Sequence, residues 1–286
     1  MRLYTMYVSE REGLAMNTRK PAVAGQFYPK DAQSLQRMVE RYLEQAEPAP
    51  APERVAAIVV PHAGYVYSGP TAGFSYKRVS GKTCGRVILL GTSHRYSIPG
   101  ASVYTSGAFQ TPLGTFPVDE EFAKRLARKT GSVSVEPHVS EHSLEVQLPF
   151  LYLSVGEAPI VPVLFGDRAD ETHIEAGRLL AGMVSDDDLI VASTDLSHYL
   201  SQEEAHQIDK RTLDAILEKD PDAVARGIAR GAYSMCGSAA VVAAMAYAMT
   251  RGATEWSLLD YRTSAETSGD YGQVVGYAAV SMEYQQ

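Results

Sequence analysis

Three histidines of this sequence follow apolar runs at short distances, and imidazole can bind a metal ion or move a proton. The segments AIVVPH, VILLGTSH and LIVASTDLSH each combine a predicted strand, a short polar turn and a histidine, which is His62, His94 or His198. Strand ends of an open α/β sheet converge over a crevice, so the three rings are expected at one rim. A lone loop histidine more often bonds a nearby carbonyl, but three together favour a metal site over an acid–base pair alone.

Cys236 is the second group that can do chemistry, because it precedes a predicted helix rich in small residues. In the segment MCGSAAVVAAMAYAMT, Gly237 allows a tight turn and Ser238 can cap the helix. The positive end of a helix dipole lowers the pKa of a thiol and favours the thiolate. The alternative is a buried, unreactive cysteine in a small-residue packing face. Cys84 precedes a strand without such a context and is predicted to be structural.

Three further residues are candidates for the same pocket. Asp195 lies three residues before His198, where it can orient an imidazole or cap the turn after the strand. His142 lies at the start of an apolar-periodic segment and is predicted to line the pocket from the N-terminus of a helix. Tyr65 follows His62 in a predicted turn, where it either closes the pocket or covers the sheet edge.

The other titratable residues near these motifs have simpler interpretations. Glu141 and Glu145 are interpreted as solvated acids at the start of an amphipathic helix. His138, His173 and His206 lie in polar surroundings without a partner pattern, so they are assigned to the surface.

These groups need a sheet whose strand ends share one side, and the hydrophobic pattern predicts such a sheet. Four continuous apolar runs are predicted as strands covered on both faces: residues 55–60, 86–90, 160–164 and 189–192. Helices are predicted at 31–46, 119–129, 142–153, 171–184 and 203–218. Residues 101–117 are expected to form a hairpin or excursion, and 256–263 and 274–282 two late strands. The order predicts a three-layer α/β fold with a mixed β-sheet flanked by helices.

Composition limits the classes of function. The 286 residues carry a formal net charge of −8 with no basic block, which argues against a nucleic-acid partner. No apolar run approaches the roughly 20 residues that a membrane-spanning helix needs, so no membrane segment is expected. The two cysteines exclude a disulfide framework and favour a reducing, cytoplasmic setting.

Length and motif positions predict one domain. A chain of 286 residues lies near the upper limit of what one core supports. Residues 1–18 lack an apolar period and are expected to form an extension, with Met16 as an alternative start. Residues 19–286 are expected to form a single α/β domain, inside which the Pro-Ala alternation of residues 47–53 is a surface linker.

Seven motifs, in order along the chain, resemble the Memo-like family, also described as AmmeMemoRadiSam system protein B. They are KPAVAGQFYP, PHAGYVYSG, LGTSH, EHSLEVQLPFL, STDLSHY, MCG and TSAETSGDYGQVVGYAA, and they span Lys20 to Ala279. Each is a modest signal alone, but seven in the same order are specific. The resemblance implies the fold of class III extradiol dioxygenases, with one pocket at the strand ends.

The resemblance also implies ligands and roles. His62, His94 and Cys236 stand where that superfamily holds its metal, and His198 stands where its acid–base histidine lies. Separately from the resemblance, the position of Asp195 predicts that it tunes His198. Cys236 replaces the glutamate ligand of the dioxygenases, and a thiolate ranks iron, copper(I) and zinc differently from a carboxylate. Iron(II) is the first expectation by resemblance, and copper or zinc is the alternative.

Two functions are open at this point. The first is a metal-dependent redox enzyme that acts on a small or modified organic substrate, with a radical S-adenosylmethionine protein and an AmmeCR-like protein as the partners that the resemblance implies. The second is a non-catalytic module that captures a peptide or a metabolite in the same pocket. The three histidines and the thiol support the first, and the missing carboxylate ligand supports the second.

Overall fold

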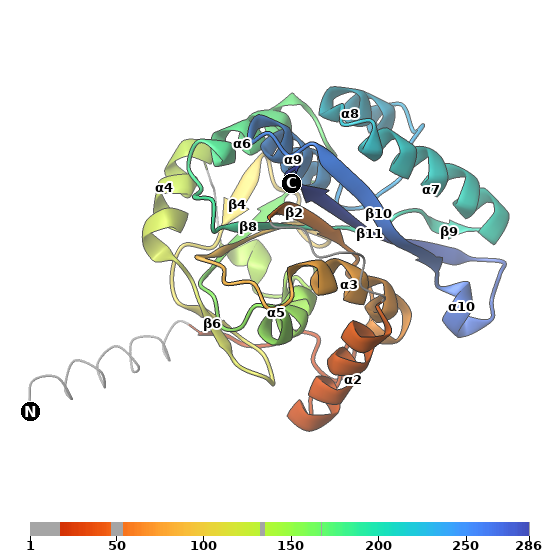
Figure 1. Ribbon diagram of the computed structural model, residues 1–286, viewed down its shortest axis with the longest axis horizontal. Coiled ribbons are helices and arrows are strands. Elements are labelled where there is room, and N and C mark those ends of the chain that lie inside the picture. The colour runs from red at the N-terminus through yellow and green to blue at the C-terminus, as the bar shows by residue number, and fades with distance from the viewer. Residues whose placement is uncertain (1–17, 47–53, 132–134, 167, 286) are drawn as a thin grey trace, which may run out of the picture.

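A computed structural model describes residues 18–46, 54–131, 135–166 and 168–285, and its centre is a mixed sheet with helices on both faces (Figure 1). The strand order is β10-β11-β2-β8-β3-β7-β4. The four inner strands β2 (Val55–Val60), β8 (Leu189–Ser193), β3 (Val87–Thr92) and β7 (Ile160–Phe165) are parallel. Strands β10 (Glu255–Thr263), β11 (Val274–Glu283) and β4 (Ala101–Val103) pair antiparallel with their neighbours.

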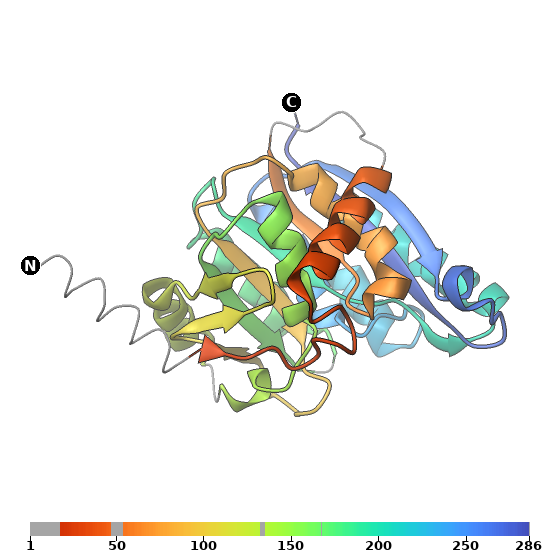
Figure 2. The same cartoon turned by 90° about the horizontal axis from the view of Figure 1, so that it is seen from below.

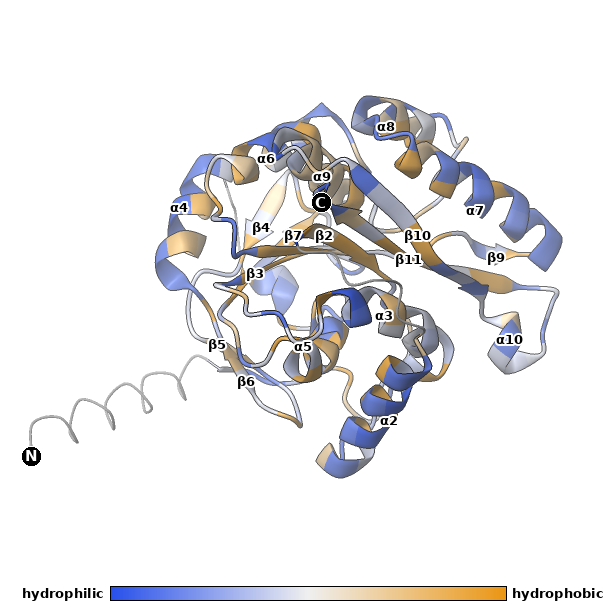
Figure 3. Ribbon diagram, in the orientation of Figure 1, coloured by the Kyte–Doolittle hydropathy of each residue, from blue (hydrophilic) through white to orange (hydrophobic). Residues whose placement is uncertain are grey.

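The parallel strands are buried on both faces, as their unbroken apolar sequences predict. All residues of β3, β7 and β8 are buried, and β2 is buried from Ala56 onward. Figure 3 shows the same strands as the hydrophobic centre between more hydrophilic helices. The predicted strands are therefore confirmed within two residues at each end.

Two helical layers cover the sheet. One face carries α2 (Ala32–Gln45), α3 (Tyr65–Val79) and α5 (Leu148–Ser154); α3 packs on β2, and α2 and α5 pack on α3 and on each other. The other face carries α6 (Glu171–Ala181), α7 (Gln202–Leu217), α8 (Pro221–Ala229) and α9 (Ser238–Thr250). The helix α4 (Glu120–Thr130) packs against β4 and β7. This arrangement is the predicted three-layer α/β fold, and one hydrophobic core runs through it from Val23 to Met282.

The stretch between β4 and α4 leaves the main sheet as expected, whereas β4, at the start of the predicted excursion, joins the edge of that sheet beside β7. Strands β5 (Ala108–Gln110) and β6 (Thr115–Pro117) form a hairpin, and β1 (Thr18–Arg19) adds to it in parallel. Figure 2 shows this small sheet beside the main one, next to the first described residues. The segment 18–19 is thereby fixed to a region that is about 90 residues away in sequence.

The sequence did not predict helix α3, and the turn expected at Tyr65 is its first turn. Pro70 lies inside this helix and cannot donate a hydrogen bond to the carbonyl of Val66, four residues earlier. The Thr267 hydroxyl of α10 (Ala265–Ser268) donates to that carbonyl instead, at 3.1 Å. A tertiary contact therefore satisfies the group that proline leaves free, which local sequence does not reveal.

Other boundaries also differ from the prediction. The helix expected from His142 starts later, as a 3-10 turn (Glu145–Gln147) that leads into α5, and α8 was not predicted. A second 3-10 turn covers Glu136–His138. The expectations for residues 1–17 and for the linker at 47–53 lie outside the described residues. Within the described part of the chain, none of the helices has the length and apolar character to cross a membrane.

Candidate metal centre

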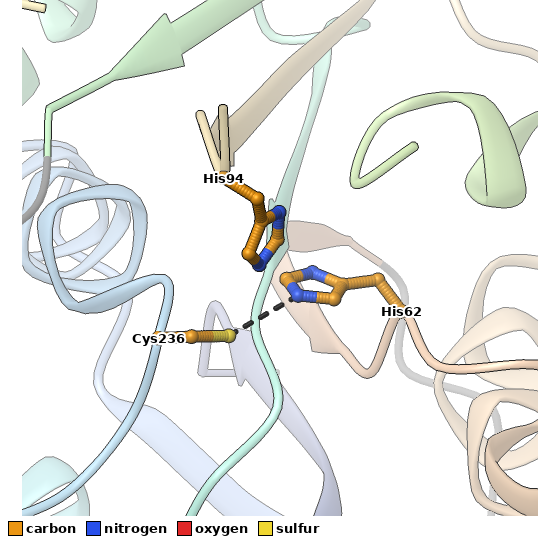
Figure 4. A group of neighbouring side chains, drawn as sticks. All are labelled: His62, His94 and Cys236. Atoms are coloured by element: carbon orange, nitrogen blue, oxygen red, sulfur yellow. Dashed lines mark hydrogen bonds between the residues drawn. The ribbon is translucent and has the colours of Figure 1, made fainter. Parts of the chain in front are cut away.

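The site lies beyond the carboxyl ends of β2, β3 and β8, which are neighbours in the sheet. His62 follows β2 by two residues and His94 follows β3 by two residues. Cys236 lies in the loop before α9. Its backbone N–H donates to the backbone carbonyl of Asp195, which follows β8, at 3.1 Å. The candidate ligand atoms of these three residues lie within 4.8 Å of one another (Figure 4). The structure thus brings together the three residues that the resemblance names.

The His62 ring is buried, and its hydrogen bonds fix which nitrogen carries the proton. Its Nδ1 lies 2.9 Å from the hydroxyl of Ser193. That hydroxyl donates its only hydrogen to the Ser143 carbonyl, at 2.6 Å, so it can only accept from His62. His62 therefore carries its proton on Nδ1, and the lone pair of Nε2 faces the Cys236 sulfur at 3.1 Å.

The His94 ring is held in the same way by a carboxylate. Its Nδ1 lies 3.0 Å from Glu141 Oε1, and its backbone N–H donates to Oε2 at 2.7 Å. Burial alone would lower the pKa of His94, but the hydrogen bond to Glu141 and the charges of Glu141 and Asp195 together outweigh burial and raise it. Because the carboxylate accepts at Nδ1, Nε2 is again the free nitrogen of the neutral ring. A third of the His94 side chain is exposed, so the cluster is open to solvent on this side.

Glu141, His94 and His142 form a second group with ligand-like spacing. The Glu141 oxygens already accept from the backbone N–H groups of His94, His142 and Ser143 and from the His94 ring. Three of these bonds fall on Oε1 and one on Oε2, so the carboxylate is held in place and in turn holds the His94 ring. Burial raises the pKa of Glu141, but the neighbouring His94 and His142 outweigh it and hold that pKa well below its usual range. His142 lies parallel to His94, with ring centroids 4.6 Å apart.

Cys236 is positioned by close backbone contacts. The Asp195 N–H points at its sulfur at 3.2 Å, and Gly237 packs on β8, where a Cβ would lie 2.2 Å from the Ser193 carbonyl. The expected lowered pKa is wrong for the metal-free protein, because burial, with the Asp195 charge second, raises the pKa of the thiol to about 12. The predicted cap is also wrong: Gly237 is the N-cap residue of α9, and Ser238 accepts a bond from the Ala169 N–H.

Asp195 is buried and caps a backbone group. Its carboxylate accepts from the His62 N–H at 2.7 Å, so it fixes the loop that carries His62 and does not contact an imidazole in the structure. Burial raises the pKa of Asp195 to about 7. The sequence left two roles open for Asp195: orienting an imidazole or stabilising a turn. The observed bond matches the second role, because the carboxylate after β8 stabilises the turn after β2.

His198 begins the short strand β9 (His198–Leu200), which pairs with β11. Its Nδ1 lies 2.9 Å from the Leu196 carbonyl, so this nitrogen is the donor and Nε2 is free. Burial lowers the pKa of His198, which favours the neutral ring. Its neighbour Tyr199 has a φ of 61° and is 74% exposed. An unusual backbone conformation therefore lies directly beside the proposed acid–base residue.

Several predicted positions lie elsewhere. Tyr65 is in the core, where its hydroxyl donates to the Val146 carbonyl and its ring packs on Phe150, so it does not line the site. His138 and His173, assigned to the surface, are 1% and 5% exposed. His138 packs between the rings of Tyr104 and Phe109, and His173 packs against Phe165. His206 is exposed, as expected.

Sequence reasoning missed a buried network behind the site. Arg19 donates to Glu145 at 2.7 Å and to the backbone carbonyls of His138 and Glu141. Glu145 also accepts from the N–H groups of residues 22 and 23 and from the Tyr28 hydroxyl. Both acids of EHSLEVQLPFL are thus buried and are not solvated. The sequence feature that could have indicated this network is Arg19 in the segment RKPAVAGQFYP, which lies 122 residues before Glu141 and 126 before Glu145.

Comparisons with known proteins agree with these motifs. A sequence model described as "Memo-like protein" matches residues 19–281. A MEMO1 family protein of Methanopyrus kandleri is 38% identical, over 92% of this chain and 98% of its own. Another from Methanothermobacter thermautotrophicus is 36% identical, over 92% and 99%. The crystal structure of an uncharacterized protein from Escherichia coli K12 superposes with a TM-score of 0.49 at 14% identity, covering 80% of this chain and 100% of that one.

Proposed function

Because this chain belongs to the Memo-like protein family, we propose that His62, His94 and Cys236 bind one transition-metal ion, beside which His198 moves protons. One observation carries the proposal: both ligand histidines use Nδ1 for a support and direct Nε2 to a common point with a thiol. Metal-binding histidines usually have such a partner on their second nitrogen.

The donor set fits an ion with free coordination positions. Two imidazoles and one sulfur are three ligands, and a catalytic site needs at least one further position. Exposure of His94 and His142 leaves that position accessible. A bound redox metal would supply Lewis acidity or one-electron chemistry there. His198 would hold or take the substrate proton at its free Nε2.

The nature of the metal follows from the donor atoms. Iron(II) is the first choice by family resemblance, and the soft sulfur makes copper(I) a close second, with zinc as a third. A small or modified organic substrate is proposed, together with a radical S-adenosylmethionine protein and an AmmeCR-like protein as partners. Two unpaired cysteines fit a reducing cytoplasm.

The test is anaerobic loading of the full chain with Fe(II), Cu(I) or Zn(II), followed by metal analysis and oxygen uptake with catechol-like compounds. His62→Ala and Cys236→Ala are expected to lose the metal, while Cys84→Ala, the matched cysteine control, keeps it. His198→Ala should keep the metal and lose roughly 10² to 10⁴ in any turnover. Full metal occupancy in the Cys236→Ala protein would contradict the ligand set.

A second arm tests the support of His94. Glu141→Gln is expected to weaken metal binding by roughly 10- to 100-fold, the usual effect of losing such a partner. The alternative function, a non-catalytic module, is favoured by one observation: Glu141, the acid beside His94, already holds the His94 ring and neighbouring backbone N–H groups, so it supports the cluster instead of supplying the missing carboxylate ligand. Metal-free protein that binds peptides tightly would support that alternative.

A further inference from the structure

A second cavity lies away from the metal centre, between α7 and the edge strand β10. Its volume is about 480 Å³, within the range of about 300–1,000 Å³ that small-molecule sites have. In Figure 1, α7 lies along the β10–β11 pair and α10 stands near the outer end of these strands. The cavity is lined by one face of α7, by two residues of β10 and by Glu266 of α10.

The floor of this cavity is apolar. Leu213 and Leu217 project from consecutive turns of α7, and Leu258 of β10 completes the surface with 40% of its side chain exposed. The aromatic ring of Tyr261 forms another wall, with the His206 ring 5.6 Å away. An exposed leucine on an edge strand is unfavourable in water, so an apolar ligand would gain free energy by covering it.

The charged rim carries an excess of negative charge. Lys210 is neutralised by Asp214, at 2.6 Å, on the same helix face. Glu266 accepts only a long bond from the Thr263 N–H, and no cation of the described residues pairs with it. The Glu266 carboxylate, next to the aromatic ring of Tyr261, selects a ligand with N–H donors and a positive charge.

Two hydrogen bonds connect the cavity to the loop that carries His198. The Tyr261 hydroxyl donates to Asp209 Oδ2 at 2.9 Å, and Asp209 is fully buried. The other oxygen of Asp209 accepts from the Ser197 N–H at 3.0 Å. Ser197 immediately precedes His198, so a displacement of Tyr261 is passed by direct contact to the loop of the acid–base residue.

We propose that this cavity binds a small primary amine with an apolar chain, and that its occupancy is transmitted through Tyr261 and Asp209 to the loop that carries His198. The ammonium group lies toward Glu266, and the chain covers Leu213, Leu217 and Leu258. The binding site itself does not depend on a metal being bound at the other site.

The test uses hexan-1-amine as the probe, with hexan-1-ol and hexanoate as uncharged and anionic counterparts of similar size. Amide chemical shifts of the full metal-free chain are followed by NMR during each titration. Hexan-1-amine is expected to bind with a dissociation constant on the order of 1 mM, as suits so small a ligand. Hexan-1-ol should bind more weakly and hexanoate most weakly. Equal or tighter binding of hexanoate, or no saturation by the amine, would overturn the assignment.

Two variants separate the parts of the proposal. Glu266→Gln should weaken amine binding by about fivefold, the size of one exposed ion pair, while Glu255→Gln at the start of β10, which does not line the cavity, should not. Tyr261→Phe keeps the ring and removes the hydroxyl, so the amine should still bind but the Ser197 amide should stop responding. A wild-type Ser197 amide that ignores the bound amine would disprove the connection and leave only the binding site.

Discussion

His62, His94 and His198 are alike in their hydrogen bonding. Each directs Nδ1 to a group that can only accept there: the Ser193 hydroxyl, the Glu141 carboxylate and the Leu196 carbonyl. All three therefore carry an unprotonated Nε2 in their neutral form. This common tautomer suits both the proposed metal ligands and the proposed proton acceptor.

The residue beside His198 stores backbone strain. Tyr199 has a φ of 61° at a bulge, where His198 and Leu200 pair with consecutive residues of β11. A left-handed conformation costs a bulky L-residue roughly 1 kcal/mol, and the exposed Tyr199 ring repays little of it by packing. We expect Tyr199→Gly to raise the free energy of unfolding by about 1 kcal/mol, measured by urea denaturation.

Tyr271 is the matched control, because it is also an exposed tyrosine but has no positive φ. Tyr271→Gly should lower the free energy of unfolding, since glycine adds only flexibility there. A Tyr199→Gly protein that is less stable than the wild type would show that its side chain stabilises the bulge.

The sequence predicted the candidate site residues that directly follow strands. It missed the residues that support the site through contacts between segments distant in the sequence. His62, His94 and His198 were identifiable because strand, turn and histidine are neighbours in the chain. Glu141 and Arg19 were not, because their partners are backbone groups brought close only by folding. The pKa of Cys236 also depends on burial, which a helix-terminus argument does not include.

At the scale of elements, α2 and α3 touch so closely that α3 needs glycine at two positions. A Cβ on Gly73 would lie 2.5 Å from the Tyr42 carbonyl oxygen, and one on Gly69 would lie 2.4 Å from the Tyr42 ring. These glycines and Pro70 lower the helix propensity of the segment, which explains why the sequence did not predict α3. Helix packing therefore decides the local structure here.

Gly73→Ala is expected to destabilise the protein by roughly 1–3 kcal/mol, despite the higher helix propensity of alanine, because backbone atoms must move. Thermal unfolding followed by circular dichroism measures the change. Gly182→Ala at the end of α6 is the control, since its Cβ would meet Leu179 at an ordinary 3.6 Å. A Gly73→Ala protein as stable as the control would contradict the close packing of α2 on α3.

At the scale of the whole molecule, the buried His138 makes stability depend on pH. Burial lowers the pKa of His138 to about 3, whereas an unfolded chain has about 6.5. The unfolded state therefore binds the proton more tightly, so the contribution of His138 is present above about pH 6.5 and is lost as the pH falls toward 3. The loss amounts to at most about 1.4 kcal/mol per pH unit.

His138→Gln should remove this part of the slope, which urea denaturation between about pH 6.5 and 4 would reveal. The same change at the exposed His206 should leave the slope as it is. Parallel curves for the wild type and the His138→Gln protein would refute the burial argument.

Deletion of residues 1–17 should leave the melting temperature nearly unchanged, because the sequence shows no apolar period there. The deletion must stop before Thr18, which pairs with Ala108, and before Arg19, which holds Glu145. A further deletion through Arg19 is the comparison, and we expect it to destabilise the fold by roughly 3–5 kcal/mol, as loss of one partner of a buried ion pair does. A drop of several degrees on removing 1–17 alone would contradict the extension.

The position of β11 determines when the proposed metal site can form during synthesis of the chain. This last strand inserts between β10 and β2, and its Gly276 carbonyl accepts from the Leu196 N–H in the His198 loop. His62 and His94 are translated long before Cys236 and β11, so a growing chain on the ribosome can offer a metal only scattered imidazoles. We expect an ion at the proposed site to bind only after β11 and the Cys236 loop have packed against the earlier strands, so the metal available at that stage would decide which ion is bound.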